Sequence, residues 1–351
     1  MHTVCVLEPG CPSVAAVALP VLPPALRAGL RSRPMNPDDA GRWAELLAAV
    51  EEVDRRDEHH DADDCAEELA DPELDLERDT IVVLDGPAGD EATAVAYQVL
   101  RLRSGRAEGA HLISDAGVHP AFRRRGIGNA LLAVARERAG ELGATLMMRV
   151  PETNAGAVAL AEGIGMGPAR WWSELHRDLT EPVTSVPAPA GLALASLGPY
   201  YDAARWDESL RAAHNSAFAD HWGSVPASAE AWVHQRTGSR AFRPACSAVA
   251  RVADGEIAGY VFSYEHDAAT ARTGRRDLYV ATVGTIAAHR GRGVAAALLA
   301  HVLQAARDHG YDTSSLTVDA HNPTGALRVY DRAGYRLNRR EITFALPQTH
   351  P

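Results

Sequence analysis

The chain has 351 residues, of which 35 are basic and 46 acidic, for a formal charge of −11. Hydrophobic residues make up 46% and charged residues 23%, which is ordinary globular usage and excludes wholesale disorder or a fibrous repeat. Every basic residue is Arg, so mechanisms built on a lysine Schiff base or a P-loop lysine are excluded. The acidic balance argues against nucleic acid as the main partner, and the length predicts about two domains.

The cysteines and the first apolar tract bear on localisation. Four cysteines without CxxC spacing do not form a disulfide framework in a chain of this length, which favours a reduced, cytoplasmic protein. Residues 14–30 are apolar but contain three prolines, so they lack the ~20 uninterrupted residues of a membrane span. The first cation is Arg27, so the basic leader of a signal peptide is missing. We expect no membrane partner and interpret residues 1–26 as a poorly structured extension.

The next segment predicts a strand at residues 30–33 and a helix at residues 37–56. Residues 51–79 then hold 15 acidic residues and three Arg, a charge run that we interpret as a solvated helix face. Five residues within this run are of types that bind metals: His59, His60, Asp61, Asp63 and Asp64. Such residues are common on surfaces without an ion, so we predict no metal site.

A strand-like run at residues 111–118 leads into a loop rich in arginine and glycine. The loop reads Arg123, Arg124, Arg125, Gly126, Ile127 and Gly128. Apolar residues spaced for one face of a helix follow it, at Leu131, Leu132, Ala135, Ala139 and Leu142. A strand at residues 145–150 comes next, and then Asn154, which is placed as a helix cap.

The second half of the chain repeats this order. The repeat predicts strands at residues 192–197, 277–285 and 315–320 and a helix at residues 207–218. Its loop begins 167 residues after the first copy and reads Arg290, Gly291, Arg292, Gly293, Val294 and Ala295. Asn322, before Pro323, is placed as the matching helix cap.

The repeat predicts two domains of one fold. Their expected bounds are residues 27–180 and residues 191–351. The proline-rich residues 181–190 between them are stiff by composition and predict a linker.

The two loops are suited to binding phosphate. Glycine permits backbone conformations that a Cβ hinders, so successive N–H groups can turn toward one anion. The positive end of the following helix and the charged, forked donors of arginine add to this attraction. One copy of Arg-x-x-Gly-x-Gly/Ala is a weak signal, whereas two copies in matched context are a strong one.

On these motifs the sequence resembles the GNAT superfamily of N-acetyltransferases, in a tandem, mycothiol-synthase-like organisation. The resemblance covers residues 30–179 and 192–346, and the second copy is the closer match. It implies an α/β protein of two tandem GNAT domains, each a mixed, centrally splayed β-sheet flanked by helices. It also implies acetyl-CoA as co-substrate, no metal, and the pyrophosphate of acetyl-CoA bound at each loop.

The resemblance assigns acetyl-CoA-binding residues to both domains. In the second domain these are Val283, Gly284, Thr285, Arg290, Gly291, Arg292, Gly293, Val294, Ala295 and Asn322. In the first they are Ala116, Gly117, Val118, Arg123, Arg124, Arg125, Gly126, Ile127 and Gly128. The strand before each loop would offer its backbone to the pantetheine arm.

The resemblance also implies a catalytic acid. Tyr330 follows Asn322 by eight residues and would protonate the departing CoA thiolate, although an aromatic packing role is the alternative. In the first copy the same count reaches Glu162, or Ala161 if the helix is one residue shorter, and no Tyr occurs between residues 154 and 167. We therefore expect the second domain to be catalytic and the first to bind CoA without turnover.

The acceptor side is less defined. Asp220, His221 and Trp222 fall where the family places acceptor loops. Histidine is the side chain that ordinarily changes charge near neutral pH, so His221 could accept the amine proton, or it could cap or pack. We expect acetyl transfer to a primary amine, of a small molecule or a peptide, in a monomer or homodimer. The alternatives are a non-catalytic acyl-CoA sensor and an assembly module of GNAT fold.

Overall fold

The computed structural model describes residues 29–346 except 88, 90, 106–108, 220, 222–223 and 323–324. The predicted extension at residues 1–26 lies outside the described residues. We call residues 29–180 the N-terminal half and residues 181–346 the C-terminal half. In the N-terminal half the elements are β1 (Leu30–Arg33), η2 (Pro37–Asp39), α1 (Ala40–Asp54), α2 (Ala62–Leu69), α3 (Leu76–Asp79), β2 (Thr80–Asp85), β3 (Thr93–Gly105), β4 (Gly109–Val118), η3 (Pro120–Phe122), α4 (Ile127–Glu141), β5 (Thr145–Pro151), α5 (Ala155–Gly163) and β6 (Gly167–Asp178).

The C-terminal half has the same order of main elements. They are β7 (Ala193–Ser196), α6 (Ala203–Ala217), α7 (Ala229–Trp232), η4 (Val233–Thr237), η5 (Pro244–Cys246), β8 (Ala248–Arg251), β9 (Ile257–Tyr264), α8 (Asp267–Thr273), β10 (Asp277–Thr285), η6 (Ala287–His289), α9 (Val294–Asp308), β11 (Thr313–Asp319), α10 (Ala326–Arg332) and β12 (Arg336–Leu346). The repeated pattern of strand, loop, helix and strand is thereby confirmed.

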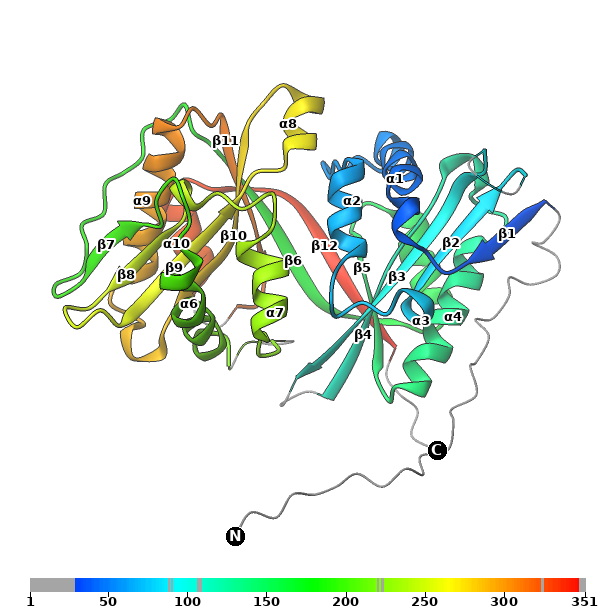
Figure 1. The fold of residues 1–351 in the computed structure, drawn as a ribbon, viewed down its shortest axis with the longest axis horizontal. Helices are drawn as coiled ribbons and strands as arrows, with labels where there is room; N and C mark the ends of the chain where they lie inside the picture. The colour runs from blue at the N-terminus through cyan, green and yellow to red at the C-terminus, as the bar shows by residue number, and fades with distance from the viewer. Residues whose placement is uncertain are drawn as a thin grey trace, which may run out of the picture.

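One twelve-stranded sheet runs through both halves (Figure 1). Its order is β1-β2-β3-β4-β5-β12-β6-β11-β10-β9-β8-β7, and only β4 with β5 and β10 with β11 pair in parallel. Successive side chains of a strand point to opposite faces of the sheet, so the two faces pack against different helices. In the N-terminal half α1 and α2 cover one face and α4 and α5 the other. In the C-terminal half α6 and α7 cover one face and α9 and α10 the other.

The last strand of each half crosses to the other half. β12 pairs with β5, and β6 pairs with β11, so the two exchanged strands lie side by side at the centre of the sheet (Figure 1). The predicted division at residues 181–190 follows chain order and stays a prediction, since the exchanged strands complete each other's half. Without the exchanged strand, each half would have an unpaired strand edge here, at β5 or at β11.

Two local expectations are corrected by hydrogen bonds. Helix α6 begins at Ala203, before the predicted residue 207, because the Asp202 carboxylate accepts the N–H of Arg205 at 3.1 Å and caps it. Asn154 does cap α5, accepting the N–H of Ala157 at 3.0 Å. Asn322 does not cap α10: it lies in the turn after β11, and α10 begins at Ala326 behind a left-handed Gly325.

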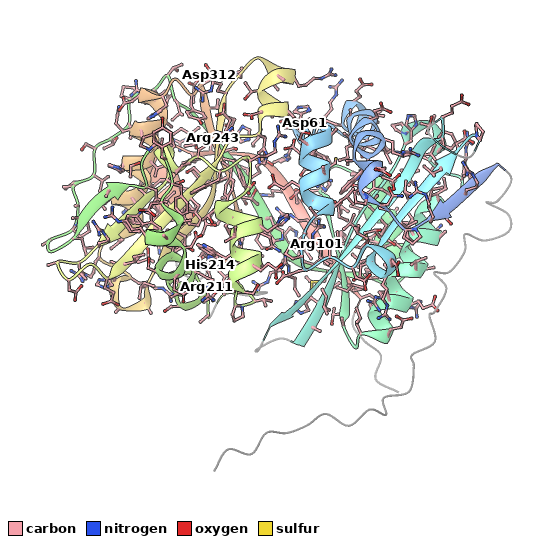
Figure 2. All side chains as sticks on the ribbon, viewed as in Figure 1. Asp61, Arg101, Arg211, His214, Arg243 and Asp312 are labelled. Carbon is pink, nitrogen blue, oxygen red and sulfur yellow. The ribbon has the colours of Figure 1, made fainter. Side chains whose placement is uncertain are left out.

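The sequence suggested that the acidic run at residues 51–79 is a solvated helix face. Part of this run instead contacts the C-terminal half. Asp61 and Asp64 accept hydrogen bonds from one guanidinium nitrogen of Arg240, at 2.6 and 2.7 Å, and Glu67 accepts the Arg240 backbone N–H at 3.1 Å. Figure 2 shows Asp61 on the side of α2 that faces the C-terminal half. The run therefore supplies an ionic contact between the halves.

Candidate active site

Each half contains a pair of parallel strands that separate along their length. β4 pairs with β5 only over residues 111–114, and β10 pairs with β11 only over residues 277–279. Beyond these points β4 and β10 keep hydrogen-bonded neighbours only on their other side, in β3 and β9. The predicted segments Ala116–Val118 and Val283–Thr285 thus lie on free strand edges. The Val118 and Thr285 carbonyls accept the Nε–H of Arg123 and Arg290, and the other backbone groups on these edges have no strand partner on this side.

The two separating strands differ in regularity. β10 shifts register against β9 between Val280 and Thr282, which leaves Ala281 as an extra residue. β4 pairs with β3 over ten successive residues without a shift. A bulge of this kind interrupts the ladder and redirects backbone groups, and it is common beside active sites. Only the C-terminal half has it in this strand.

Both glycine-rich loops have the same backbone form. The second and fourth loop residues have positive φ in each copy: +62° at Arg124 and +88° at Gly126, then +73° at Gly291 and +85° at Gly293. Helices α4 and α9 begin directly after, and neither has a side-chain cap. A Cβ added at Gly291 or Gly293 would project into open space. The N–H groups of these helix starts suit an anion such as a pyrophosphate.

The loop arginines are partly engaged with the protein. Arg123 donates to both carboxylate oxygens of Asp54, at 2.7 and 3.0 Å, and Arg290 donates to the Ala217 carbonyl at 2.7 Å. Arg125 stacks on the Phe122 ring at 4.7 Å. The Arg292 guanidinium lies 3.1 Å from Nδ1 of His289.

Tyr330 lies where the second pair of strands separates. It belongs to one apolar cluster with Val280 and Val283 of β10 and with Leu316 and Val318 of β11. Its side chain is 9% exposed, and burial, with a smaller contribution from Tyr279, raises the pKa of Tyr330 to about 12. The phenol is therefore protonated at neutral pH and can donate a proton.

The backbone resolves which residue of the first copy corresponds to Tyr330. The N–H of Tyr335 donates to the Tyr330 carbonyl at 3.0 Å, around Gly334 with φ of +89°. In the N-terminal half the N–H of Met166 donates to the Ala161 carbonyl at 3.1 Å, around Gly165 with φ of +87°. Ala161, which is buried, thus takes the place of Tyr330, and Glu162 is exposed.

A tyrosine packs against the free-edge strand in each half, which the sequence analysis missed. A Cβ on Gly284 would lie 2.4 Å from Cε1 of Tyr260, and a Cβ on Gly117 would lie 2.5 Å from Cε1 of Tyr97. The Tyr260 hydroxyl is 2.5 Å from Nδ1 of His214. Burial, and to a lesser extent Arg236, lowers the pKa of His214 to about 4. A local sequence pattern does not reveal these tyrosine–glycine pairs, because the two members of each pair lie opposite each other on neighbouring strands.

The predicted acceptor residues are only partly described. Asp220 and Trp222 lie outside the described residues. The His221 ring lies 5.6 Å from the Phe218 ring, in the turn after α6. His221 also has a further contact in this structure.

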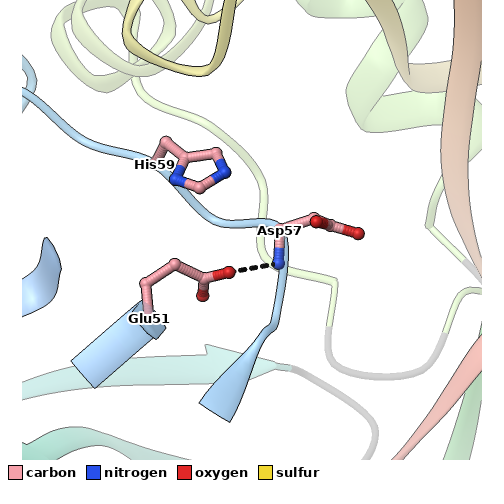
Figure 3. Close-up of side chains that lie close together, drawn as sticks. All are labelled: Glu51, Asp57 and His59. Carbon is pink, nitrogen blue, oxygen red and sulfur yellow. Dashed lines mark hydrogen bonds between the residues drawn. The ribbon is translucent and has the colours of Figure 1, made fainter. Parts of the chain in front are cut away.

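One group of metal-binding residue types lies close together among the described residues. Ligand atoms of Glu51, Asp57 and His59 lie within 4.8 Å of one another (Figure 3). Both oxygens of Glu51 already accept backbone N–H groups, from Arg56 at 2.9 Å and Asp57 at 2.8 Å. The Glu51 carboxylate therefore binds backbone N–H groups just beyond the C-terminal end of α1.

Comparisons with known proteins agree with this geometry. The family model described as the acetyltransferase (GNAT) family matches residues 44–166 and 207–335. The chain belongs to the GNAT family of acetyltransferases. Acetyl transfer from acetyl-CoA is the activity of this family, and two copies of its fold stand in tandem here.

The GNAT chain has curated relatives named mycothiol acetyltransferase. One from Clavibacter michiganensis is 34% identical over 72% of this chain and 78% of the relative. One from Tsukamurella paurometabola is 31% identical over 66% and 77%.

Solved structures resemble the fold of this GNAT chain. A GCN5-related N-acetyltransferase from Sphaerobacter thermophilus has a TM-score of 0.67 at 24% identity, covering 93% of this chain and 96% of its own. A tandem GNAT protein from the clavulanic acid biosynthesis pathway has a TM-score of 0.66 at 22% identity, covering 91% and 100%. Within the described residues, no helix is both long and apolar enough to cross a membrane.

Proposed function

We propose that the C-terminal half transfers the acetyl group of acetyl-CoA to a primary amine by direct attack. The observation that carries this assignment is Tyr330, a buried phenol in the cluster that joins β10 and β11, where the N-terminal half has Ala161. The bulge in β10 supports the same choice, because it frees backbone groups beside the place for the thioester.

The proposed chemistry needs no covalent enzyme intermediate. The neutral amine nitrogen attacks the thioester carbonyl carbon, and backbone N–H groups of β10 polarise the carbonyl oxygen. When the C–S bond breaks, the sulfur takes a proton from the Tyr330 hydroxyl, and the amine releases a proton to water. The tyrosinate then regains its proton from solvent. Because burial raises the pKa of Tyr330, the tyrosinate readily binds that proton again.

We propose that the N-terminal half binds acetyl-CoA without turnover. Its loop keeps both positive-φ positions and an uncapped helix start, which support phosphate binding. It lacks a phenol at the place of Tyr330, which supports the absence of chemistry. Up to two equivalents of acetyl-CoA per chain are then expected.

Two measurements test the assignment. Isothermal titration with acetyl-CoA should give binding that Gly293→Val weakens, because a side chain at this left-handed residue strains the loop and occupies phosphate space. Release of CoA thiol over a panel of amines should give turnover with at least one acceptor. Binding without any turnover would favour an acyl-CoA sensor, and no binding would favour an assembly module.

The acceptor panel should begin with mycothiol-type compounds, because the curated relatives carry that name. Small amines, aminoglycoside-like compounds and peptide N-termini complete it. Two buried free thiols, Cys65 and Cys246, support a reducing, cytoplasmic location. Size-exclusion chromatography with light scattering would separate a monomer from a homodimer.

A further inference from the structure

The first arginine of each loop is bonded in the same way in both halves. Nε of Arg123 donates to the Val118 carbonyl at 3.0 Å, and its two terminal nitrogens donate to Asp54. Nε of Arg290 donates to the Thr285 carbonyl at 3.2 Å, and Nη2 donates to the Ala217 carbonyl. Each guanidinium thus has one bond to a strand end and at least one to a second element.

The second hydrogen-bond partner of each arginine lies at the same place in the two halves, the end of a helix, but the accepting group differs. Asp54 is the last residue of α1, and Ala217 is the last residue of α6. One contributes a side-chain carboxylate and the other a main-chain carbonyl. The carbonyl end of a helix carries partial negative charge and has unsatisfied acceptors, so it attracts a guanidinium even without a carboxylate. The contact is therefore kept by position in the fold and not by one residue type.

The bonding leaves Arg123 in particular poorly placed to be a ligand of phosphate. Asp54 holds both terminal nitrogens of Arg123 in a bidentate pair, and its side chain is 14% exposed. A phosphate beside this guanidinium would also approach the Asp54 carboxylate and be repelled by it. The backbone N–H groups at the starts of α4 and α9, in contrast, have no side-chain cap.

We propose that Arg123 and Arg290 are positioning residues, which clamp the phosphate loop between the preceding strand and the first helix of each half. The loop's backbone N–H groups, and not these two side chains, then hold the phosphates. This inference rests on the proposed binding of acetyl-CoA at the loops. It differs from the expectation that Arg290 binds the pyrophosphate directly.

The N-terminal half offers a test in which the two roles predict opposite signs. Asp54→Asn, measured in a full chain that also carries Gly293→Val to block the second loop, removes the clamp partner. We expect acetyl-CoA affinity to fall several-fold, since charged hydrogen bonds that order the loop are lost. If Arg123 were a phosphate ligand, removing the competing carboxylate would instead increase affinity. Glu45→Gln, on the exposed side of the same helix, removes the same charge as a control.

The C-terminal half offers a second test, in a full chain carrying Gly126→Val. Arg290→Lys keeps the positive charge but cannot reach two carbonyls with a planar fork. We expect Arg290→Lys and Arg290→Ala to weaken acetyl-CoA binding alike, by about tenfold. The dependence of affinity on salt concentration should stay that of the parent chain, because no phosphate contact is lost. Asp54→Glu, which keeps a carboxylate, should retain most of the affinity of the N-terminal site.

The outcomes separate the clamp from the proposed function. Higher affinity in Asp54→Asn, near-parental affinity in Arg290→Lys, or a weaker salt dependence in Arg290→Ala would overturn the clamp and leave the CoA site in place. Acetyl-CoA binding that neither Gly126→Val nor Gly293→Val affects would overturn the proposed site, and the clamp with it. Thermal melts show which variants fold, and Asp54→Glu and Arg290→Lys are conservative enough to keep the test available.

Discussion

The two halves of this GNAT protein keep the same loop backbone but differ in the residues around it. Both loops have positive φ at the second and fourth positions, and both helices that follow start without a side-chain cap. The C-terminal half adds Tyr330 and the bulge at Ala281, whereas the N-terminal half has Ala161 and a regular strand. The loop backbone is thus the same in both halves although the side chains around it differ.

The largest expected effect concerns Tyr330. Tyr330→Phe keeps the ring in its cluster and removes only the proton, so turnover should fall by about 10²–10⁴ while acetyl-CoA affinity stays within a few-fold. The measurement is steady-state thiol release with an accepted amine. Glu162→Gln, on the exposed side of α5, is the control and should leave the rate nearly unchanged. A Tyr330→Phe rate above about half of the parent, with chemistry limiting, would assign the acid elsewhere.

The glycines under the tyrosines give the next effect. Gly284→Ala places a Cβ against the buried Tyr260 ring, and Gly117→Ala does the same at Tyr97. Each should destabilise the fold by about 1–3 kcal/mol, because the strand or the ring must move. If only the C-terminal half is catalytic, Gly284→Ala should also reduce turnover and Gly117→Ala should not. Gly41→Ala, in α1 with open space around it, is the control for both melts. Equal losses of turnover in the two variants would contradict the asymmetry.

The buried His214 predicts a pH effect specific to the C-terminal half. Because its folded-state pKa of about 4 is below the usual value of 6.5, the unfolded chain binds a proton that the folded chain does not. Stability from this group is present above about pH 6.5 and decreases as pH falls toward 4, by about 2 kcal/mol at pH 5. Denaturant unfolding at pH 7.5 and pH 5 measures it. His214→Gln should remove this part of the pH dependence, and His301→Gln on α9 serves as the control. An unchanged pH dependence in His214→Gln would show that another group is responsible.

The smallest effect compares the second residue of each loop. Arg124 and Gly291 both have positive φ, which costs a residue with a Cβ about 1 kcal/mol. Gly291→Ala should therefore destabilise by about 1 kcal/mol. Arg124→Gly should change stability by less than about 0.5 kcal/mol, because relief of strain is offset by the entropy of an unfolded glycine. Thermal melts of both variants test this, and a clear stabilisation by Gly291→Ala would contradict the shared loop form.

Much of the fold was predictable because its signals are local. The strand at residues 277–285 and the strand at residues 30–33 have the predicted bounds, since alternating side chains and the flanking loops mark them. One prediction from a local signal, the cap at Asn322, was wrong. Asn322 had the type and spacing of a cap, but it lies in the turn after β11, and α10 begins at Ala326 behind Gly325.

The acidic run shows why charge patterns alone mislead. Asp61 and Asp64 lie within a few residues of one another, and a solvated helix face is the usual meaning of such a run. Their partner, Arg240, is 179 and 176 residues away along the chain. Only the docking of the halves brings that guanidinium to the run. Asp54 of the same run contacts Arg123, which is 69 residues away within the N-terminal half, so here the folding of one half makes the contact.

The sequence by itself determined the duplication, the two arginine- and glycine-rich loops, the family and the position of Tyr330, because each depends on residue types at short, fixed spacing. The tertiary structure decided what depends on distant chain segments meeting. It exchanged β6 and β12 between the halves, placed Ala161 and not Glu162 at the position equivalent to Tyr330, and turned Arg123 and Arg290 toward helix ends. Hydrogen bonds between strands and between a guanidinium and a helix end form across any sequence separation, so no local pattern encodes them.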